Sequence, residues 1–225
     1  MPNGAPNCAR CPYKPPERLC SKEGGKHPAF CPIRTMSELV EQSLKEYHSN
    51  LSICEFARQA TIQEGDGYIN KGHGYEQVRG SKTRIEEIMG FAKKMNYTCL
   101  GMAFCMGLRK EAKIVEEIFS SGGFDVISAV CNVGGIPKEQ IGIHKDQQIN
   151  PNAIEAMCNP ILQAMILNKA QTDFNVLLGL CVGHDSLFFK YADAPCTVLA
   201  VKDRVLGHNP LAAIYTADSY YRSLK

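Results

Sequence analysis

The sequence feature that most constrains the fold is the stretch at residues 173–185, DFNVLLGLCVGHD. Residues 174–180 form a short, almost unbroken apolar run that favours β structure, which predicts a strand buried on both faces. Cys181 follows directly, and Asp185 is a suitable N-cap for a helix that begins at Ser186. We therefore expect a thiol where a parallel strand passes into a helix, at the edge of an open α/β sheet where ligands bind.

Two other predicted strands also stop at a cysteine. Residues 97–104 predict a strand that ends at Cys105, and residues 124–130 predict one that ends at Cys131. A fourth strand is expected at residues 195–201, and helical patterns separate the strands. Alternating strands and helices favour an α/β fold, here an open, mainly parallel four-stranded sheet with helices on both faces.

The remaining helices are predicted from caps and apolar spacing. Residues 35–64 carry apolar stripes of two helices, broken near Ser49 and Asn50, and Thr83 with Glu86 predicts a capping box for the next helix. Further helix starts are expected at residues 150–152, at Asn159 with Pro160 as the first helical residue, and at residues 209–210 for a final helix that reaches residue 221.

Cysteine is the unusual component of the composition. The chain holds 11 cysteines in 225 residues, and it is too large to need disulfides for stability. No signal-peptide pattern follows Met1 and no apolar run is long enough to span a membrane, so we expect a cytoplasmic protein in which cysteines bind metal. A formal net charge of +2 gives no indication of nucleic-acid binding.

Residues 1–34 are predicted to be a separate cysteine-rich metal-binding segment, followed by an α/β domain at residues 35–225 whose first part is helical. The segment is rich in Pro, Gly and charge, so it cannot fold around an apolar core. Four thiolates on a metal would organise it. One C-x2-C pair and two Cys-Pro steps favour a [4Fe-4S] cluster over zinc, with His27 as a possible substitute ligand. The predicted ligands are Cys8, Cys11, Cys20 and Cys31.

A second metal site is predicted at the carboxyl edge of the sheet. Equivalent ends of neighbouring parallel strands lie along one edge about 4.8 Å apart, so the strand-end thiols can converge. Cys158, just before a predicted helix start, would supply the fourth sulfur of a second [4Fe-4S] cluster. The alternative is that these cysteines fill the core as small apolar residues. The predicted cluster ligands are Cys105, Cys131, Cys158 and Cys181.

Several residues near these strand ends are candidates for the pocket. His184 is the candidate catalytic residue, as a proton carrier or a donor to a cluster sulfide, although it can also be an ordinary capped histidine. Residues 132–135, NVGG, are either an anion-binding nest or a tight turn. The loop after the fourth strand can face the pocket or only the solvent, and its candidates are Lys202, Asp203, Arg204 and His208.

Six blocks of sequence resemble an uncharacterised, cysteine-rich domain-of-unknown-function family, number 1847, of predicted metal-binding proteins from anaerobic bacteria and archaea. The blocks are the N-terminal C-x2-C with Cys20 and Cys31, GMAFCMGL, CNVGG, CNPILQAMILN, GLCVGHDSLF and VKDRVLGHNP. The resemblance extends along the whole chain. It implies metal binding but no particular reaction.

Three functions remain open from the sequence. The first is a cytosolic iron-sulfur redox protein, either an electron carrier or an oxidoreductase, whose N-terminal cluster relays electrons and whose strand-edge cluster binds or reduces a small ligand. The second is a zinc-binding protein with a small-molecule or nucleotide pocket. The third is a thiol enzyme with Cys158 or Cys181 as nucleophile and His184 as base. The expected partners are an electron-transfer protein or a small-molecule ligand, with no nucleic acid, no membrane and a possible homo-oligomer.

Overall fold

The computed structural model describes residues 5–225, so residues 1–4 of the predicted cysteine-rich segment lie outside the described residues. The chain forms two compact units that are divided between Ile62 and Gln63. The boundary predicted between residues 34 and 35 lies inside the first unit, and it stays a prediction. Each unit is described separately below. Within residues 5–225, no helix combines the length and apolar character needed to cross a membrane.

The first unit consists of short turns followed by two longer helices. The break predicted near Ser49 and Asn50 is confirmed, because Asn50 is extended and its side-chain oxygen accepts the N–H of Ile53 at 3.3 Å. Asn50 thereby stops one helix and caps the next. The elements are η1 (Cys8–Arg10), η2 (Pro15–Glu17), α1 (Pro32–Thr35), α2 (Ser37–Ser49) and α3 (Leu51–Asp66), which continues into the second unit.

The first unit has almost no buried interior. Among residues 5–62, Gly25 alone is buried. It lies where the chain doubles back between Arg18 and Lys26, and a Cβ at this position would come within 2.4 Å of the Arg18 carbonyl oxygen. This unit therefore lacks the apolar core that stabilises an ordinary domain.

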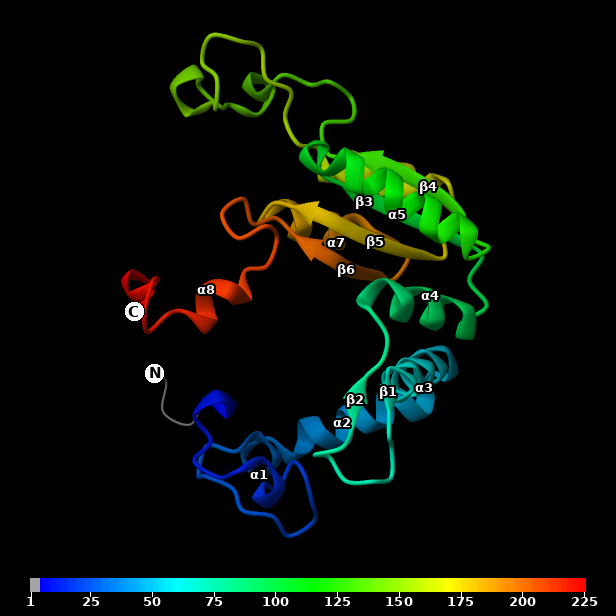
Figure 1. Ribbon diagram of the computed structural model, residues 1–225, viewed down its shortest axis with the longest axis vertical. Helices are drawn as coiled ribbons and strands as arrows, with labels where there is room; N and C mark the ends of the chain where they lie inside the picture. The colour runs from blue at the N-terminus through cyan, green and yellow to red at the C-terminus, as the bar shows by residue number, and fades with distance from the viewer. Residues whose placement is uncertain (1–4) are drawn as a thin grey trace. The chain divides into compact units, whose positions relative to one another are not determined.

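The second unit contains the four-stranded sheet (Figure 1). Its strand order is β4-β3-β5-β6, every pair is parallel, and the predicted α/β fold is confirmed. The helices are α4 (Arg84–Lys94), α5 (Arg109–Ser121), α6 (Pro160–Lys169), α7 (His184–Tyr191) and α8 (Leu211–Tyr215). The strands are β1 (Tyr68–Ile69), β2 (Arg79–Gly80), β3 (Cys99–Phe104), β4 (Asp125–Val130), β5 (Phe174–Leu180) and β6 (Cys196–Val201), and the short 3-10 turns are η3 (Met106–Leu108), η4 (Lys138–Ile141), η5 (Lys145–Gln147) and η6 (Arg222–Leu224).

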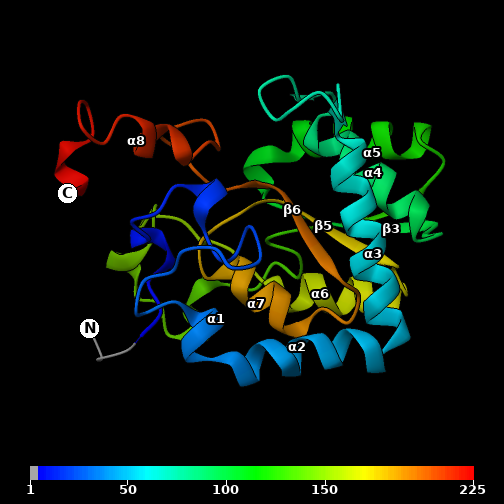
Figure 2. The same ribbon diagram turned by 90° about the horizontal axis from the view of Figure 1, so that it is seen from below.

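The sheet carries helices on both faces, with α5 on one and α6 and α7 on the other (Figure 2). Strand β5 has the bounds predicted for it and is buried along its whole length, as expected for a central parallel strand. Alternate residues of β3 face opposite sides of the sheet. Ala103 lies on the side of α6 and α7, where it packs in one core cluster with Leu177 of β5 and Phe188 of α7. This core fixes where the carboxyl ends of the strands lie.

Gly179 interrupts the regular pairing of β5 just before its end. Its φ is +69°, and the register with β6 shifts on both sides of Leu178. A Cβ at Gly179 would lie 2.1 Å from Leu108 Cδ1, so glycine is required by both backbone and space. The bulge lies immediately before Leu180 and Cys181.

The capping predictions had mixed outcomes. The capping box is confirmed, since the Glu86 carboxylate accepts the N–H of Thr83 at 2.7 Å. Asn159 is confirmed as the N-cap of α6, because its side-chain oxygen accepts the N–H of Leu162 at 3.0 Å. Asp185 as an N-cap is wrong: helix α7 begins at His184 with Gly183 as N-cap. Gly183, with φ +85°, makes the turn two residues earlier than expected.

Two predicted helices are absent or shorter than expected. No helix starts at residues 150–152, where the Glu155 carboxylate instead accepts the N–H groups of Ile149 and Asn150 and holds an irregular excursion. The final helix ends at Tyr215 instead of residue 221. There Thr216 turns its hydroxyl back to the Ala212 carbonyl at 2.8 Å and leaves the helical conformation.

Candidate functional site

Four cysteines lie at the carboxyl edge of the sheet, and we call them the strand-edge thiols: Cys105, Cys131, Cys158 and Cys181. The first two follow the neighbouring strands β3 and β4, and Cys181 follows β5 on the other side of β3. Cys158 precedes the N-cap of α6, and the Asn159 N–H donates to the Cys131 carbonyl at 2.6 Å. That bond brings a residue distant in sequence to the same edge.

Three of the strand-edge thiols lie close enough to shift one another's pKa. The Cys131 thiol hydrogen-bonds to Cys105 and to Cys158, so it lies at the centre of the three. Cys181 interacts with Cys158 through charge, and its sulfur accepts a hydrogen bond from Arg204 Nη2 at 3.2 Å. The structure thus brings together all four cysteines predicted for this site. Their role as metal ligands stays a prediction.

The interactions among Cys105, Cys131 and Cys158 shift the pKa values of the three thiols in different directions. The hydrogen bond with Cys131, followed by burial, raises the pKa of Cys105 to about 12. For Cys131, the hydrogen bond with Cys105 lowers the pKa, but the bond with Cys158 and burial outweigh it and leave the pKa raised. The hydrogen bond with Cys131 lowers the pKa of Cys158 in spite of burial. Cys158 is therefore the first of the three to become a thiolate.

Backbone N–H groups and one ammonium group also point at the sulfurs. The Met106 N–H donates to Cys131 Sγ at 3.3 Å, and the Gly107 N–H and the Lys202 ammonium both hydrogen-bond to Cys105. Lys202 fits beside two glycines, since a Cβ on Gly107 or Gly179 would lie 3.6 or 3.8 Å from its Nζ. N–H donors and cations of this kind stabilise thiolates and tune metal centres.

The loop after β6 divides the four pocket candidates into two pairs. Lys202 and Arg204 reach the strand-edge thiols, as described above. Asp203 instead accepts the N–H groups of Val205 and Leu206 at 3.0 and 2.8 Å. His208, at φ +67°, takes the Asp203 N–H on Nδ1 at 3.1 Å. Asp203 and His208 therefore hold the loop in shape and do not contact the thiols.

His184 begins helix α7, and its backbone N–H donates to the Cys181 carbonyl at 3.0 Å. Its side chain makes no hydrogen bond or ion pair within the described residues 5–225. The sequence places it beside the site, and its catalytic role stays a prediction.

Residues 132–135 form a tight turn in which the N–H groups of Val133 and Gly135 bond to Val130 and Asn132 carbonyls. Those two N–H groups are thereby used within the turn.

Cysteines outside the two predicted sets lie elsewhere. Cys99 and Cys196 are the first residues of β3 and β6, at the amino edge of the sheet, as expected. Burial raises the pKa of both thiols. Cys54 is a half-buried thiol in the first turn of α3. None of the three belongs to either predicted site.

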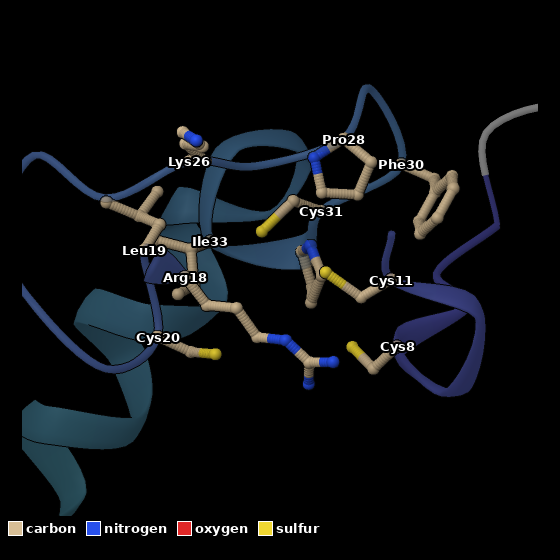
Figure 3. A pocket seen from close by; sticks show the side chains of 11 residues that line it. Cys8, Cys11, Arg18, Leu19, Cys20, Lys26, Pro28, Phe30, Cys31 and Ile33 are labelled. Atoms are coloured by element: carbon tan, nitrogen blue, oxygen red, sulfur yellow. The ribbon is translucent and has the colours of Figure 1, made fainter. Parts of the chain in front are cut away.

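The first unit contains a pocket lined by the four N-terminal cysteines (Figure 3). The sulfurs of Cys8, Cys11, Cys20 and Cys31 point toward a common space, and the Arg18 guanidinium lies between Cys20 and Cys8 (Figure 3). Arg18 is held by a bond from its Nε to the Tyr13 carbonyl at 2.8 Å. His27 is not among the residues that line this pocket, and its Nδ1 lies 3.4 Å from the Pro28 carbonyl.

The two cysteine sets fit a metal group by the chemistry of their donors. Each set has four thiols and at least one neighbouring cation, and the N-terminal sulfurs point to a common space (Figure 3). As they stand, no three His, Cys, Asp or Glu side chains among residues 5–225 already have the arrangement of a metal site. Next to Cys131, the Asn132 side-chain oxygen is buried without a partner in the same part of the chain. Such an orphaned acceptor is consistent with a site that awaits a further group.

Sequence reasoning missed the backbone N–H donors around the sulfurs. The N–H donors of Met106 and Gly107 follow from the 3-10 turn after β3, for which Gly107, two residues after Cys105, was the signal in the sequence. Gln163 was also missed: it is fully buried in α6, and its Nε2 donates to the Ala129 and Phe104 carbonyls at 2.7 and 3.3 Å. It joins the ends of β3 and β4 just before their cysteines.

The fold and the site define an α/β protein with a cysteine-lined sheet edge and a cysteine-rich N-terminal unit. The chain belongs to the family described as protein of unknown function DUF1847, whose profile matches residues 31–199, and this confirms the predicted family. The resemblance outside these residues and the metal binding that it implies stay predictions. It is 54% identical over 140 residues to the uncharacterized protein MJ0455 of Methanocaldococcus jannaschii, a match that covers 62% of this chain and 69% of that protein. No solved structure matches.

Proposed function

We infer that this protein is an iron-sulfur redox protein with two cysteine-ligated sites. The N-terminal thiols would hold a cluster that relays electrons, and the strand-edge thiols would hold a second cluster that binds or reduces a small ligand. The observation that carries this proposal is the meeting of four cysteines from four separate segments at one edge of the sheet. Four sulfurs are the usual ligand set of a [4Fe-4S] cluster, which supplies one-electron transfer when bound.

The surroundings of the strand-edge thiols support a charged group over a purely apolar packing role. Thiols that only fill a core are surrounded by hydrocarbon. Here Cys105 faces the Lys202 ammonium, Cys181 accepts from Arg204, and Cys131 accepts a backbone N–H. These donors would stabilise four thiolates and offset the negative charge of the group that they hold.

In the N-terminal unit, the shape of the pocket favours a cluster over a single zinc ion. Sulfurs that bind one zinc, each about 2.3 Å from it, nearly touch one another and leave no cavity between them. The N-terminal sulfurs instead stand around a pocket whose walls include Leu19, Phe30 and Ile33. Apolar walls of this kind shield a cluster from water, and Arg18 would offset part of its charge.

The test is metal analysis of anaerobically purified protein. We expect a brown protein that contains iron and acid-labile sulfide in equal amounts, about four of each for each of two clusters. Colourless protein with stoichiometric zinc would replace this proposal with the zinc-binding alternative. Iron for only one cluster would restrict the proposal to one site, and the cysteine variants in the Discussion would identify which one.

One observation favours a second candidate, a thiol enzyme with Cys158 as nucleophile. Cys158 is the strand-edge thiol whose pKa is lowered, mainly by its hydrogen bond with Cys131. The proposed base, His184, makes no side-chain hydrogen bond with it among the described residues, so the geometry favours this candidate less. Metal-free protein that retains an activity sensitive to alkylation of Cys158 would support the thiol enzyme and overturn the redox proposal.

A further inference from the structure

The strand-edge thiols have one side that is open to solvent. Cys131 is buried, whereas Cys105, Cys158 and Cys181 are half-buried. Beside Cys181, the residues Val182, Gly183 and Arg204 are exposed. A small molecule can therefore reach the site past Cys181.

Two cations flank this open side. Arg204 is exposed and donates to Cys181 Sγ at 3.2 Å, and the charges of Cys105 and Cys158 also raise its pKa after Cys181. Lys202 reaches Cys105 from the same loop. Since Cys105 and Cys181 follow neighbouring strands about 4.8 Å apart, the two cations converge on the gap between them.

The loop that carries the two cations is fixed before any ligand arrives. Asp203 accepts two backbone N–H groups, the His208 N–H donates to the Asp203 carbonyl at 2.9 Å, and the Lys202 N–H donates to the Leu180 carbonyl at 3.1 Å. Lys202 lies in the space left by Gly107 and Gly179. A site whose charged groups are held in place loses little entropy when it binds a ligand.

From this arrangement we propose that Lys202 and Arg204 form the binding site for a small carboxylate ligand of the strand-edge centre. On ligand binding, the Arg204 guanidinium would release its hydrogen bond to the Cys181 sulfur and bind the carboxylate. Its planar group donates two parallel hydrogen bonds to the two carboxylate oxygens. Lys202 would neutralise the remaining charge on the Cys105 side. This inference rests on the proposed function, and it names the class of ligand that the second site takes.

The backbone around the site argues against a phosphate. Phosphate sites use free N–H groups of glycine turns or helix N-termini. Here the N–H groups of His184 and Asp185 donate to the Cys181 carbonyl, and that of Ser186 donates to the Asp185 carboxylate at 2.8 Å. Recognition at this edge is therefore left to the two side-chain cations.

The test is calorimetric titration of oxalate into anaerobically prepared protein, with iron measured in the same samples. Wild-type protein should bind oxalate, and Arg204→Gln and Lys202→Gln should each weaken binding about tenfold or more, because each removes a hydrogen bond between charged groups. Arg204→Lys should lose part of the affinity, since it keeps the charge but not the fork. The matched control is Arg222→Gln, an exposed arginine that donates to the Asp218 carbonyl.

The outcomes separate this inference from the proposed function. Protein with iron at both sites that does not bind oxalate, binds inorganic phosphate more tightly, or binds oxalate equally well in all variants overturns the carboxylate site and leaves the redox proposal intact. Protein without iron at the strand-edge site overturns the redox proposal and this inference with it.

Discussion

The two cysteine sets of this protein are held in opposite ways. The N-terminal thiols come from one short segment, between Cys8 and Cys31, in a unit where Gly25 is the sole buried residue among residues 5–62. The strand-edge thiols are spread from Cys105 to Cys181 and are positioned by a buried sheet. The N-terminal thiols are close together because they are near one another in the sequence, without a core around them. The strand-edge thiols are far apart in the sequence, and the packed core of the sheet brings them together.

This difference predicts how strongly the folding stability of each site depends on a bound group. A segment without a core gains its folding free energy from the metal that it binds. A sheet edge is already arranged, so a metal there adds to the stability of a domain that folds without it. We therefore expect loss of the N-terminal group to unfold its segment and loss of the strand-edge group to leave the sheet intact.

The largest effect is expected from Cys8→Ala combined with Cys11→Ala. This variant should lose about half of the iron, and amide hydrogen exchange should show residues 5–35 unprotected while β5 keeps its protection, because in the proposed function the cluster would be the main stabilising group of that segment. Cys54→Ala, a cysteine of α3 outside both sets, is the matched control and should keep all of the iron. Unchanged iron in the double variant would remove the N-terminal cluster from the proposal.

The second prediction concerns Cys131→Ala, which removes the thiol at the centre of the strand-edge set. It should lose the other half of the iron and still unfold cooperatively, at a denaturant concentration lowered by the lost metal binding and by the cavity of one sulfur, which costs about 1 kcal/mol. Cys196→Ala, a half-buried thiol at the opposite edge, is the control for packing. If both variants kept their iron, the strand-edge thiols would be core residues only.

Gln163→Leu tests whether the sheet edge is arranged by the fold itself. The change leaves the Ala129 and Phe104 carbonyls without their side-chain donor, and it should lower the free energy of unfolding by about 1 to 2 kcal/mol in urea titrations. Iron content should not change. Exposed Gln140→Leu provides the comparison, and a Gln163 variant of wild-type stability that loses strand-edge iron would show that the metal, and not the core, positions these thiols.

The smallest effect is a pH dependence in the excursion between Cys131 and Cys158. An ion pair with Lys145 at 2.5 Å lowers the pKa of Glu139 from 4.5 to about 2. Because the folded pKa is below the unfolded one, the stabilisation by this pair is complete above pH 4.5 and is lost as the pH falls toward 2.

NMR titration of the Glu139 side chain measures this pKa directly. Lys145→Met should move the midpoint up toward the ordinary value of a glutamate, while the remaining hydrogen bonds of Glu139 keep it somewhat below that value. A wild-type midpoint near 4.5 would contradict the ion pair. The Cys131 carbonyl should keep its bond with the Asn159 N–H throughout, because that bond lies at the base of the excursion and not at Glu139.

Much of the fold could be predicted because it depends on local patterns. The apolar run of residues 174–180, the capping box at Thr83 and the cap at Asn159 each depend on a few neighbouring residues, and all three were found where expected. The errors occurred where a local signal competed with another contact. Gly183, and not Asp185, is the N-cap of α7. Where a helix start was predicted, the Glu155 carboxylate instead accepts the Asn150 N–H.

For the strand-edge site, the sequence determined which residues end each strand, and hence that Cys105, Cys131 and Cys181 share an edge. Only the tertiary structure decided their contacts: Cys131 between Cys105 and Cys158, and Arg204 on Cys181. The physical reason is that strand ends follow from hydrophobic patterning along the chain, which a sequence displays. The directions of thiols, N–H groups and cations instead depend on the bulge at Gly179, the turn at Met106 and the loop at Asp203, which are set by packing between distant segments.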